Sequence, residues 1–161
     1  MVGDHLHRIT IDLAVQSAKD GMVAELSPED FQRLLAFRTG LRRFLYWSQT
    51  QAKAAGLTPA QHQLLVAIKG HPGGRDPAIG DLAAALLLRH HSAVELVDRA
   101  AAAGLVRRHS DPGDGRITRV QLTADGEARL ATLGPAHVEE LRNLAPVLDE
   151  LVTGWEIRRL P

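Results

Sequence analysis

Basic side chains gather in one stretch of this sequence, between residues 89 and 119. Its six arginines stand against four acids, which leaves a surplus of two positive charges before three histidines are counted. Guanidinium groups pair with phosphates and with the edge of guanine, and imidazoles donate and accept hydrogen bonds. The stretch therefore has the chemistry of a nucleic-acid contact. Its bases are Arg89, His90, His91, Arg99, Arg107, Arg108, His109, Arg116 and Arg119.

The charge of the whole chain does not favour nucleic acid, so any such function must come from this local patch. The 161 residues contain 19 Lys and Arg against 19 Asp and Glu, a net charge of zero. We therefore expect weak non-specific binding and dependence on a second copy of the chain, which would double the phosphate contacts.

An enzyme is not expected. The chain has no cysteine, which excludes a disulfide scaffold, a thiolate zinc site and a thiol-based switch. It also has no Gly-x-Ser-x-Gly elbow, no glycine-rich phosphate loop and no His-Glu-x-x-His pair, so no catalytic residue and no cofactor are assigned. Eight histidines keep a metal-responsive protein open as an alternative, but none are spaced i, i+4, and no metal ligand is assigned.

Length and composition predict one helical domain outside the membrane. Hydrophobic residues make up 45% of the chain and aromatic residues only 4%, so leucine, alanine and valine must build the core. The longest apolar run is 82–88, where a membrane helix needs about 20 residues. The first eight residues lead to no apolar segment typical of a signal peptide, and a cytoplasmic location is the simplest expectation.

Start signals place the first helices. Residues 1–27 read as an N-terminal extension with a helix over about 9–26, and Ser27 then caps a long helix that starts at Pro28 and ends at Gly56. Thr58 and Gln61 form a capping box for a second helix that ends near Gly70.

A helix-turn-helix is predicted next. Apolar residues over 79–86 keep helical spacing, and Ser92 and Glu95 have the spacing of another capping box shortly afterwards. Two helices joined so tightly indicate a helix-turn-helix, with Gly104 as the left-handed cap of the second helix. One face of that helix is apolar, through Ala93, Leu96, Val97, Ala100 and Gly104. The other face carries His91, Ser92, Glu95, Asp98, Arg99 and Ala102.

After this helix, the spacing of apolar residues changes from the helical period to the two-residue alternation of β-strands. Residues 106–110 and 116–122 read as two strands around a polar turn over 111–115, and Arg119 alternates to the solvent face. A helical region follows from 123 to about 154, with a kink expected at Gly134–Pro135 and a last segment from Pro146.

The order of these elements and several short motifs resemble the MarR (multiple antibiotic resistance regulator) family of winged-helix regulators over about residues 31–154. Each motif is weak alone, but together they follow the family pattern in order and spacing. They are Asp81-Leu82-Ala83, Val97-Asp98-Arg99, Ala103-Gly104-Leu105-Val106-Arg107-Arg108, Asp111-Pro112, Asp114-Gly115-Arg116 and Val120-Gln121-Leu122-Thr123-Ala124-Asp125-Gly126.

The resemblance implies a mainly α fold with a small β-hairpin, a winged helix-turn-helix flanked by dimerisation helices. The corresponding segments are the extension 1–27, a dimerisation helix 28–57, the DNA-binding region 58–122 and C-terminal dimerisation helices 123–161. Seven apolar residues would then await a partner chain: Leu130, Leu133, Val138, Leu141, Leu144, Leu148 and Leu151. An intrachain helical pair is the alternative.

The function implied is a homodimeric transcription regulator, usually a repressor, that binds a near-palindromic operator and is released by a small aromatic acid or phenol. This effector would bind near Arg42, Tyr46, Trp47 and His62; the alternative is that these residues belong to the core, where aromatic residues on amphipathic helices are more often found. A winged-helix adaptor that binds protein instead of DNA is a second alternative, because the net charge is zero.

The expected DNA contacts come from the second helix of the motif and from the wing. Arg99 either contacts DNA or pairs with Asp98 or Asp114, while Glu95 either accepts from cytosine, pairs with an arginine or completes the cap, the last being favoured. Gly115 stands where the family pattern often has another arginine, which argues against deep minor-groove insertion. The DNA-binding candidates are Arg89, His90, His91, Ser92, Glu95, Arg99 and Arg116, and the wing candidates are Asp111, Asp114, Gly115 and Arg119.

Overall fold

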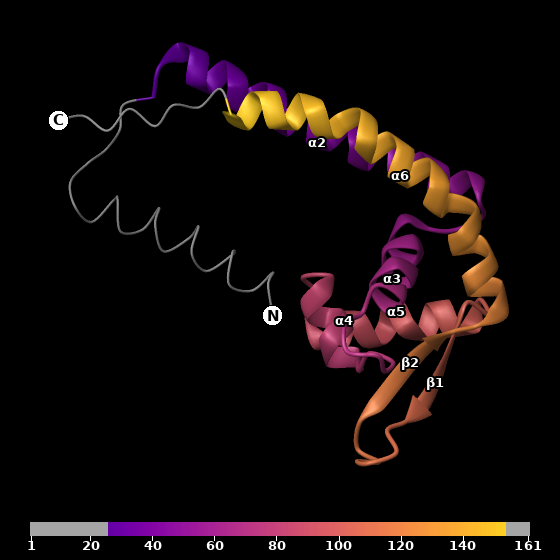
Figure 1. The fold of residues 1–161 in the computed structure, drawn as a ribbon. Helices are drawn as coiled ribbons and strands as arrows, with labels where there is room; N and C mark the ends of the chain where they lie inside the picture. The colour runs from indigo at the N-terminus through magenta and orange to yellow at the C-terminus, as the bar shows by residue number, and fades with distance from the viewer. Residues whose placement is uncertain (1–25, 154–161) are drawn as a thin grey trace, which may run out of the picture. The chain divides into compact units, whose positions relative to one another are not determined.

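The computed structural model describes residues 26–153 (Figure 1). Their elements are α2 (Pro28–Ala54), α3 (Pro59–Lys69), α4 (Ile79–Ala85), α5 (His90–Ala102), β1 (Val106–Ser110), β2 (Thr118–Leu122) and α6 (Ala124–Thr153). The predicted fold class, mainly helical with one β-hairpin, is confirmed. The helix expected over about 9–26 lies outside the described residues.

The chain divides into two compact units. In its described part, the first consists of residues 26–40 and 145–153, the N-terminal part of α2 and the C-terminal part of α6. The second consists of residues 41–144 and contains α3, α4, α5 and the hairpin together with the remainder of both long helices. The candidate DNA-contacting residues all belong to the second unit.

Side-chain caps begin α2 and α3 as the sequence predicts. Ser27 and Asp30 bond reciprocally, because the Asp30 amide donates to Ser27 Oγ at 3.2 Å and the Ser27 amide donates to Asp30 Oδ2 at 2.9 Å. Thr58 and Gln61 form the same arrangement at 3.2 and 2.8 Å. Each cap satisfies backbone donors that the first turn leaves unpaired.

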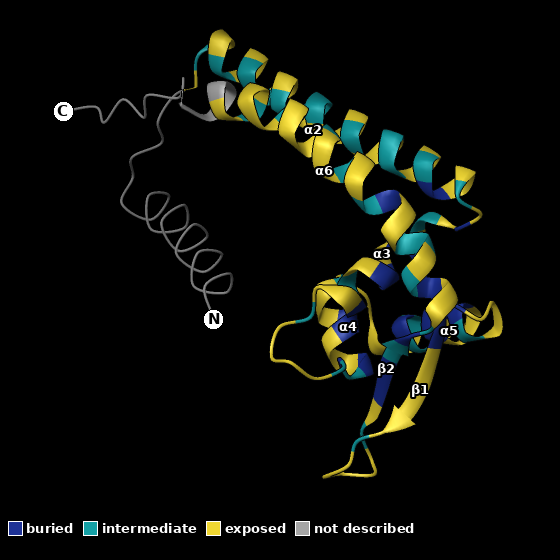
Figure 2. Cartoon of the chain, turned by 45° about the vertical axis from the view of Figure 1, so that its right-hand side comes forward, coloured by how far each residue is buried: buried dark blue, intermediate teal, exposed yellow. Residues whose placement is uncertain are grey.

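The core of the second unit is built from small and aliphatic residues on one face of each element. Figure 2 shows buried residues gathered on α3, α4, α5 and β2. Leu64, Leu65, Leu82, Val97 and Val120 are almost completely buried. This core places the opposite face of α5 in solvent.

Two left-handed residues shape the helix-turn-helix. Gly104 ends α5 at φ 72°, and the next amide, that of Leu105, donates to Ala100 O at 3.0 Å, which confirms the predicted cap. Leu87 lies in the turn between α4 and α5 at φ 54°, a conformation that favours glycine. The turn is therefore as tight as the sequence spacing implied.

β1 and β2 pair antiparallel, with Val106 opposite Leu122 and Ser110 opposite Thr118. The first strand has the predicted bounds, and the second begins two residues later than predicted. A third segment joins them, because Val120 N donates to Pro77 O at 3.0 Å and Ala78 bridges to Arg119. This third segment buries the middle of β2.

α6 runs without interruption from Ala124 to Thr153, so the separate segment expected from Pro146 is wrong, and the helix also continues through Gly134–Pro135. Its first turn packs against the end of α5: Thr123 N donates to Leu105 O at 3.0 Å, and Gly126 is buried there. Leu133 is buried in the core and Leu130 packs against it, so these two leucines of the proposed dimer set have intrachain partners.

Candidate nucleic-acid interface

α5 presents the two faces that its sequence predicts. Ala93, Leu96, Val97 and Ala100 are buried in the core, whereas Gly104, which was assigned to the same face, lies beyond the end of the helix and is exposed. His91, Glu95, Asp98, Arg99 and Ala102 are exposed, and Ser92 is half-buried. The exposed face is a helix surface of mixed charge, available to a groove of DNA.

The start of α5 differs from the prediction. The helix begins at His90, with Arg89 as the N-cap residue and no side-chain cap, so Ser92 lies inside the first turn instead of before it. The capping box predicted for Ser92 and Glu95 is therefore wrong. Residues 86–89 complete the turn after α4, so the helix has already begun when the chain reaches Ser92. His90 and His91 consequently lie on the helix itself, both exposed.

The charges of α5 pair differently from expectation. Arg99 Nη1 lies 3.7 Å from Glu95 Oε2, one turn away, instead of pairing with Asp98 or Asp114. Asp98 pairs with Arg108 of β1, at 2.8 Å. The geometry of an i, i+4 pair along one helix explains the partner of Arg99. Because the Glu95–Arg99 pair is exposed and longer than a hydrogen bond, it holds neither side chain firmly.

Several arginines of the basic stretch are already engaged within the chain. Arg107 donates to Gln121 Oε1 at 3.0 Å, and Arg108 donates to Val94 O at 3.1 Å in addition to pairing with Asp98. Within residues 26–153, the side chains of Arg89 and Arg116 have no hydrogen bond or ion pair. With the loosely paired Arg99, these two are the guanidinium groups available to a phosphate or a base.

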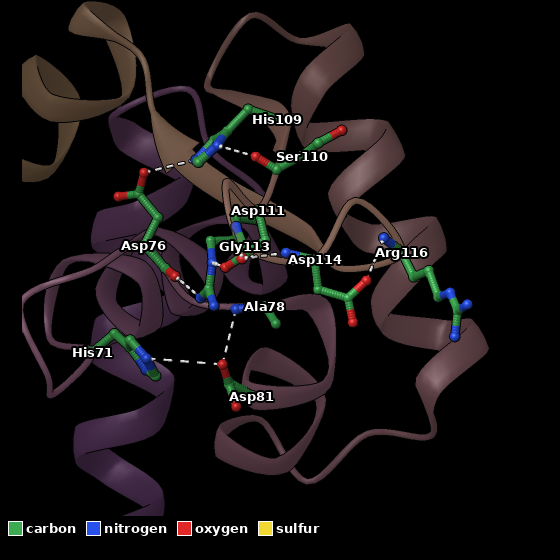
Figure 3. A network of polar contacts seen from close by, with 11 residues as sticks. His71, Asp76, Ala78, Asp81, His109, Ser110, Asp111, Gly113, Asp114 and Arg116 are labelled. Atoms are coloured by element: carbon green, nitrogen blue, oxygen red, sulfur yellow. Dashed lines mark hydrogen bonds and ion pairs between the residues drawn. The ribbon is translucent and has the colours of Figure 1, made fainter.

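The tip of the wing is held by the carboxylates of Asp111 and Asp114. Asp111 Oδ1 accepts from the amides of Gly113 and Asp114 at 2.8 and 3.0 Å, and Asp114 Oδ1 accepts from the Arg116 amide at 3.0 Å. Figure 3 shows the Arg116 side chain pointing away from this network. Gly115 is exposed. The turn thus positions one outward-pointing arginine.

The prediction that Arg119 faces solvent is wrong. Its side chain is buried, and the guanidinium donates to Asp111 Oδ2 and to the carbonyl oxygen of Asp76. The bridge at Ala78 covers this side of β2, which the alternation of the strand could not reveal. The pairing with Arg119 and the amides of the turn lower the pKa of Asp111 to about 2. Arg119 therefore anchors the wing and is unavailable to DNA.

Two histidines, one in β1 and one in the loop after α3, lie next to aspartates near the base of the wing (Figure 3). His109 Nε2 lies 2.8 Å from Asp76 Oδ2, and His71 Nε2 lies 3.8 Å from Asp81 Oδ2. Asp81 also accepts from the Ala78 amide at 2.8 Å and so caps α4. The loop that follows α3 is thereby tied to both β1 and α4. The sequence contained one signal for this arrangement of the loop, because Asp76 precedes Pro77 and a residue before proline favours extended backbone.

A second cluster joins α2, α3 and α6 within residues 41–144. The ring of His137 lies 4.9 Å from that of Trp47 and 4.6 Å from that of His62, and its Nε2 is 2.8 Å from Ser48 Oγ. Burial, and secondarily the neighbouring His137, lower the pKa of His62. Trp47 and His62, two of the residues considered for the effector site, thus both contact the ring of His137, whereas Tyr46 is exposed.

Neither a metal centre nor a membrane helix is found within the part of the chain that is described. Residues 26–153 contain no group of three or more histidine, aspartate or glutamate side chains arranged to hold a metal ion. None of the helices in the same range combines the length and the hydropathy required to cross a bilayer.

Residues 55–117 match the family model described as MarR family. They extend from the end of α2 through α5 and β1 to the far side of the wing turn. No curated protein matches the chain.

Solved structures share the fold. AbsC, a MarR family transcriptional regulator from Streptomyces coelicolor, is 22% identical with a TM-score of 0.64, and the match covers 74% of this chain and 80% of AbsC. CouR from Rhodococcus jostii RHA1, bound to p-coumaroyl-CoA, is 22% identical with a TM-score of 0.61, over 74% and 81%. The S. aureus MepR–DNA complex is 17% identical with a TM-score of 0.59, over 76% and 85%. Residues 55–117 of this chain thus match the MarR family model, and the chain shares the fold of solved MarR family regulators.

Proposed function

We propose that this chain is a repressor that binds a near-palindromic operator as a homodimer and is released by a small aromatic acid or phenol. One observation supports the DNA-binding part of this proposal. Of Arg89, Arg99 and Arg116, which lie at the start of α5, on its exposed face and at the wing tip, only Arg99 has an ion pair within the described residues, and that pair, with Glu95, is loose. Such groups can contact phosphates and bases without first breaking a buried interaction. The exposed imidazoles of His90 and His91 add polar contacts beside them.

The proposed dimer rests on apolar side chains that the described chain leaves in solvent. On α6, Val138 and Leu141 remain 48% and 49% exposed, and on α2, Leu41 and Leu45 remain 37% and 48% exposed. Exposed apolar rows of this kind are typical of interfaces. We expect Leu141→Asp to shift the mass measured by light scattering from dimer to monomer. Thr132→Asp, on the same helix, serves as the exposed control.

The proposed effector response has support from the indole and imidazole cluster of Trp47, His62 and His137. CouR, a structural relative, is bound to an aromatic acyl thioester. The cluster lies among α2, α3 and α6, so a ligand that separates the rings would alter the support of α3. A thermal-shift screen of benzoates, hydroxybenzoates and phenols should find a compound that stabilises the protein and weakens its DNA binding.

The direct test is a fluorescence-anisotropy titration with DNA from upstream of the gene and with a scrambled duplex, at two salt concentrations. A regulator should bind the first selectively, and its affinity should fall steeply with salt because phosphate contacts release counterions. Equal weak binding to both duplexes would contradict control of its own gene. Absence of binding would favour the adaptor, and binding only after zinc addition would favour the metal-responsive protein.

A further inference from the structure

Glu95 carries a negative charge on the surface of α5 that, under the proposed function, faces DNA. Its side chain lies on the exposed face of α5 and is 66% exposed. A carboxylate facing a groove lined by phosphates is repelled unless a hydrogen-bond donor meets it. The surroundings of Glu95 therefore matter for what the helix can bind.

No interaction within residues 26–153 holds Glu95 in place. It is not part of a cap, because α5 begins at His90 and has no side-chain cap. Its single ion pair, with Arg99 at 3.7 Å, is beyond hydrogen-bond distance. Asp98 on the same helix is bound to Arg108 at 2.8 Å and is thus committed to the fold. Glu95 keeps the accepting capacity of both carboxylate oxygens.

We infer that Glu95 determines sequence specificity by accepting a hydrogen bond from the exocyclic amino group of cytosine in the major groove. Cytosine and adenine both present an amino donor there, but in adenine the N7 acceptor lies beside it and repels a carboxylate. Cytosine has no such acceptor on its own edge. The inference rests on the proposed function and names the base pair that α5 prefers, a C·G pair in each half-site.

Arg99 acts as a positioning residue for this contact. Placed one helical turn from Glu95, its positive charge lowers the electrostatic cost of bringing a carboxylate near phosphates. Because the pair is exposed and loose, turning Glu95 towards a base costs little.

The test is a selection from random duplex DNA with the full-length protein, performed in parallel with wild type, Glu95→Gln and Glu95→Ala. A matched control exists on α6, where Glu139 forms a similarly exposed pair with Arg142 at 3.4 Å. Glu139→Gln changes the same kind of helical ion pair away from α5. Circular dichroism and binding to random DNA at low salt establish that each variant is folded and competent.

Wild type and Glu139→Gln should enrich the same motif, with cytosine at one fixed position of each half-site. Glu95→Ala should lose the preference at that position alone, and Glu95→Gln should shift it towards adenine, which glutamine reads in a bidentate manner. In a binding measurement, replacing that cytosine by 2-pyrimidinone, which lacks the amino group, should weaken wild type by about ten-fold. The same replacement should leave Glu95→Ala unchanged.

Two results would overturn the inference, and they are distinguishable. If wild type enriches a motif that Glu95→Ala enriches equally, Glu95 does not read a base although the regulator function stands. If wild type enriches no sequence at all, the proposed function fails together with the inference.

Discussion

Arg119 of β2 donates its guanidinium to the carboxylate of Asp111, which lies across the hairpin at the start of the wing turn. The same guanidinium also bonds the Asp76 carbonyl oxygen, so it links the wing to the loop after α3. Because both carboxylate oxygens of Asp111 are used, one by Arg119 and one by the turn amides, the wing has a defined base. The position of Arg116 depends on this anchor.

Arg119→Ala should destabilise the protein more than a comparable change on the surface. It leaves Asp111 without its charged partner in a largely buried place, and removal of one partner from such a pair is strongly destabilising. We expect a fall in Tm of roughly 5–10 °C by differential scanning calorimetry. Arg107→Ala, which removes an exposed bond to Gln121, is the matched control and should change Tm little. Equal effects of both substitutions would show that Arg119 is no anchor.

Asp111 should make stability depend on acid pH. Its pKa, about 2 in the folded protein, lies below the ordinary value of 3.8, so the ionised carboxylate stabilises the fold above about pH 4. That contribution is lost as pH falls from about 4 towards 2. The urea midpoints of wild type and Asp111→Asn should therefore differ at pH 6 and converge near pH 2. A difference that stays constant over this range would contradict the assignment.

His62 should make stability depend on pH near neutrality. Its pKa is lowered mainly by burial, so the folded protein favours the neutral ring. The contribution is fully present above the unfolded pKa of about 6.5 and is lost as pH falls through the lower folded pKa. Between pH 8 and 5, wild type should lose more Tm than His62→Phe, and His91→Gln, an exposed control, should follow wild type. Parallel curves for wild type and His62→Phe would refute this source of pH dependence.

Gly126→Ala should disrupt the junction of α6 with the end of α5. A Cβ at residue 126 would lie 2.1 Å from the Leu105 carbonyl oxygen, and neither backbone can move without disturbing the cap at Gly104. We expect a loss of unfolding free energy on the order of 2 kcal/mol or more, measured by urea denaturation. Gly115→Ala has no atom within 4 Å of the new Cβ and should be nearly neutral. Similar midpoints for the two variants would contradict the close approach.

Arg99→Ala and Arg116→Ala should each weaken operator binding by about ten-fold while the dimer remains intact. Both guanidinium groups are exposed on the proposed contact surface, and a homodimer loses two copies at once. Anisotropy at several salt concentrations measures the effect, and the salt dependence should become shallower for a lost phosphate contact. Arg142→Ala, on the exposed side of α6, is the control. Wild-type affinity in both variants would refute the site assignment.

Local sequence determined most of the helical framework. Ser27 and Thr58 cap their helices through partners three residues away, and Gly104 ends α5 because a left-handed residue is needed there. The two faces of α5 follow from its 3.6-residue period. These features depend on neighbours along the chain, so the sequence alone predicts them.

Tertiary structure decided the features that depend on residues far apart in sequence. The loop at Pro77 and Ala78 pairs with β2 and buries Arg119, although strand alternation placed it in solvent. Arg108 of β1 forms an ion pair with Asp98 of α5, and Arg99 pairs with Glu95 instead of with Asp98. The rings of His137 and His62, which are far apart in the sequence, lie 4.6 Å from each other. Periodicity and capping rules are local, whereas the choice of partner among several charged or aromatic groups depends on which elements pack together.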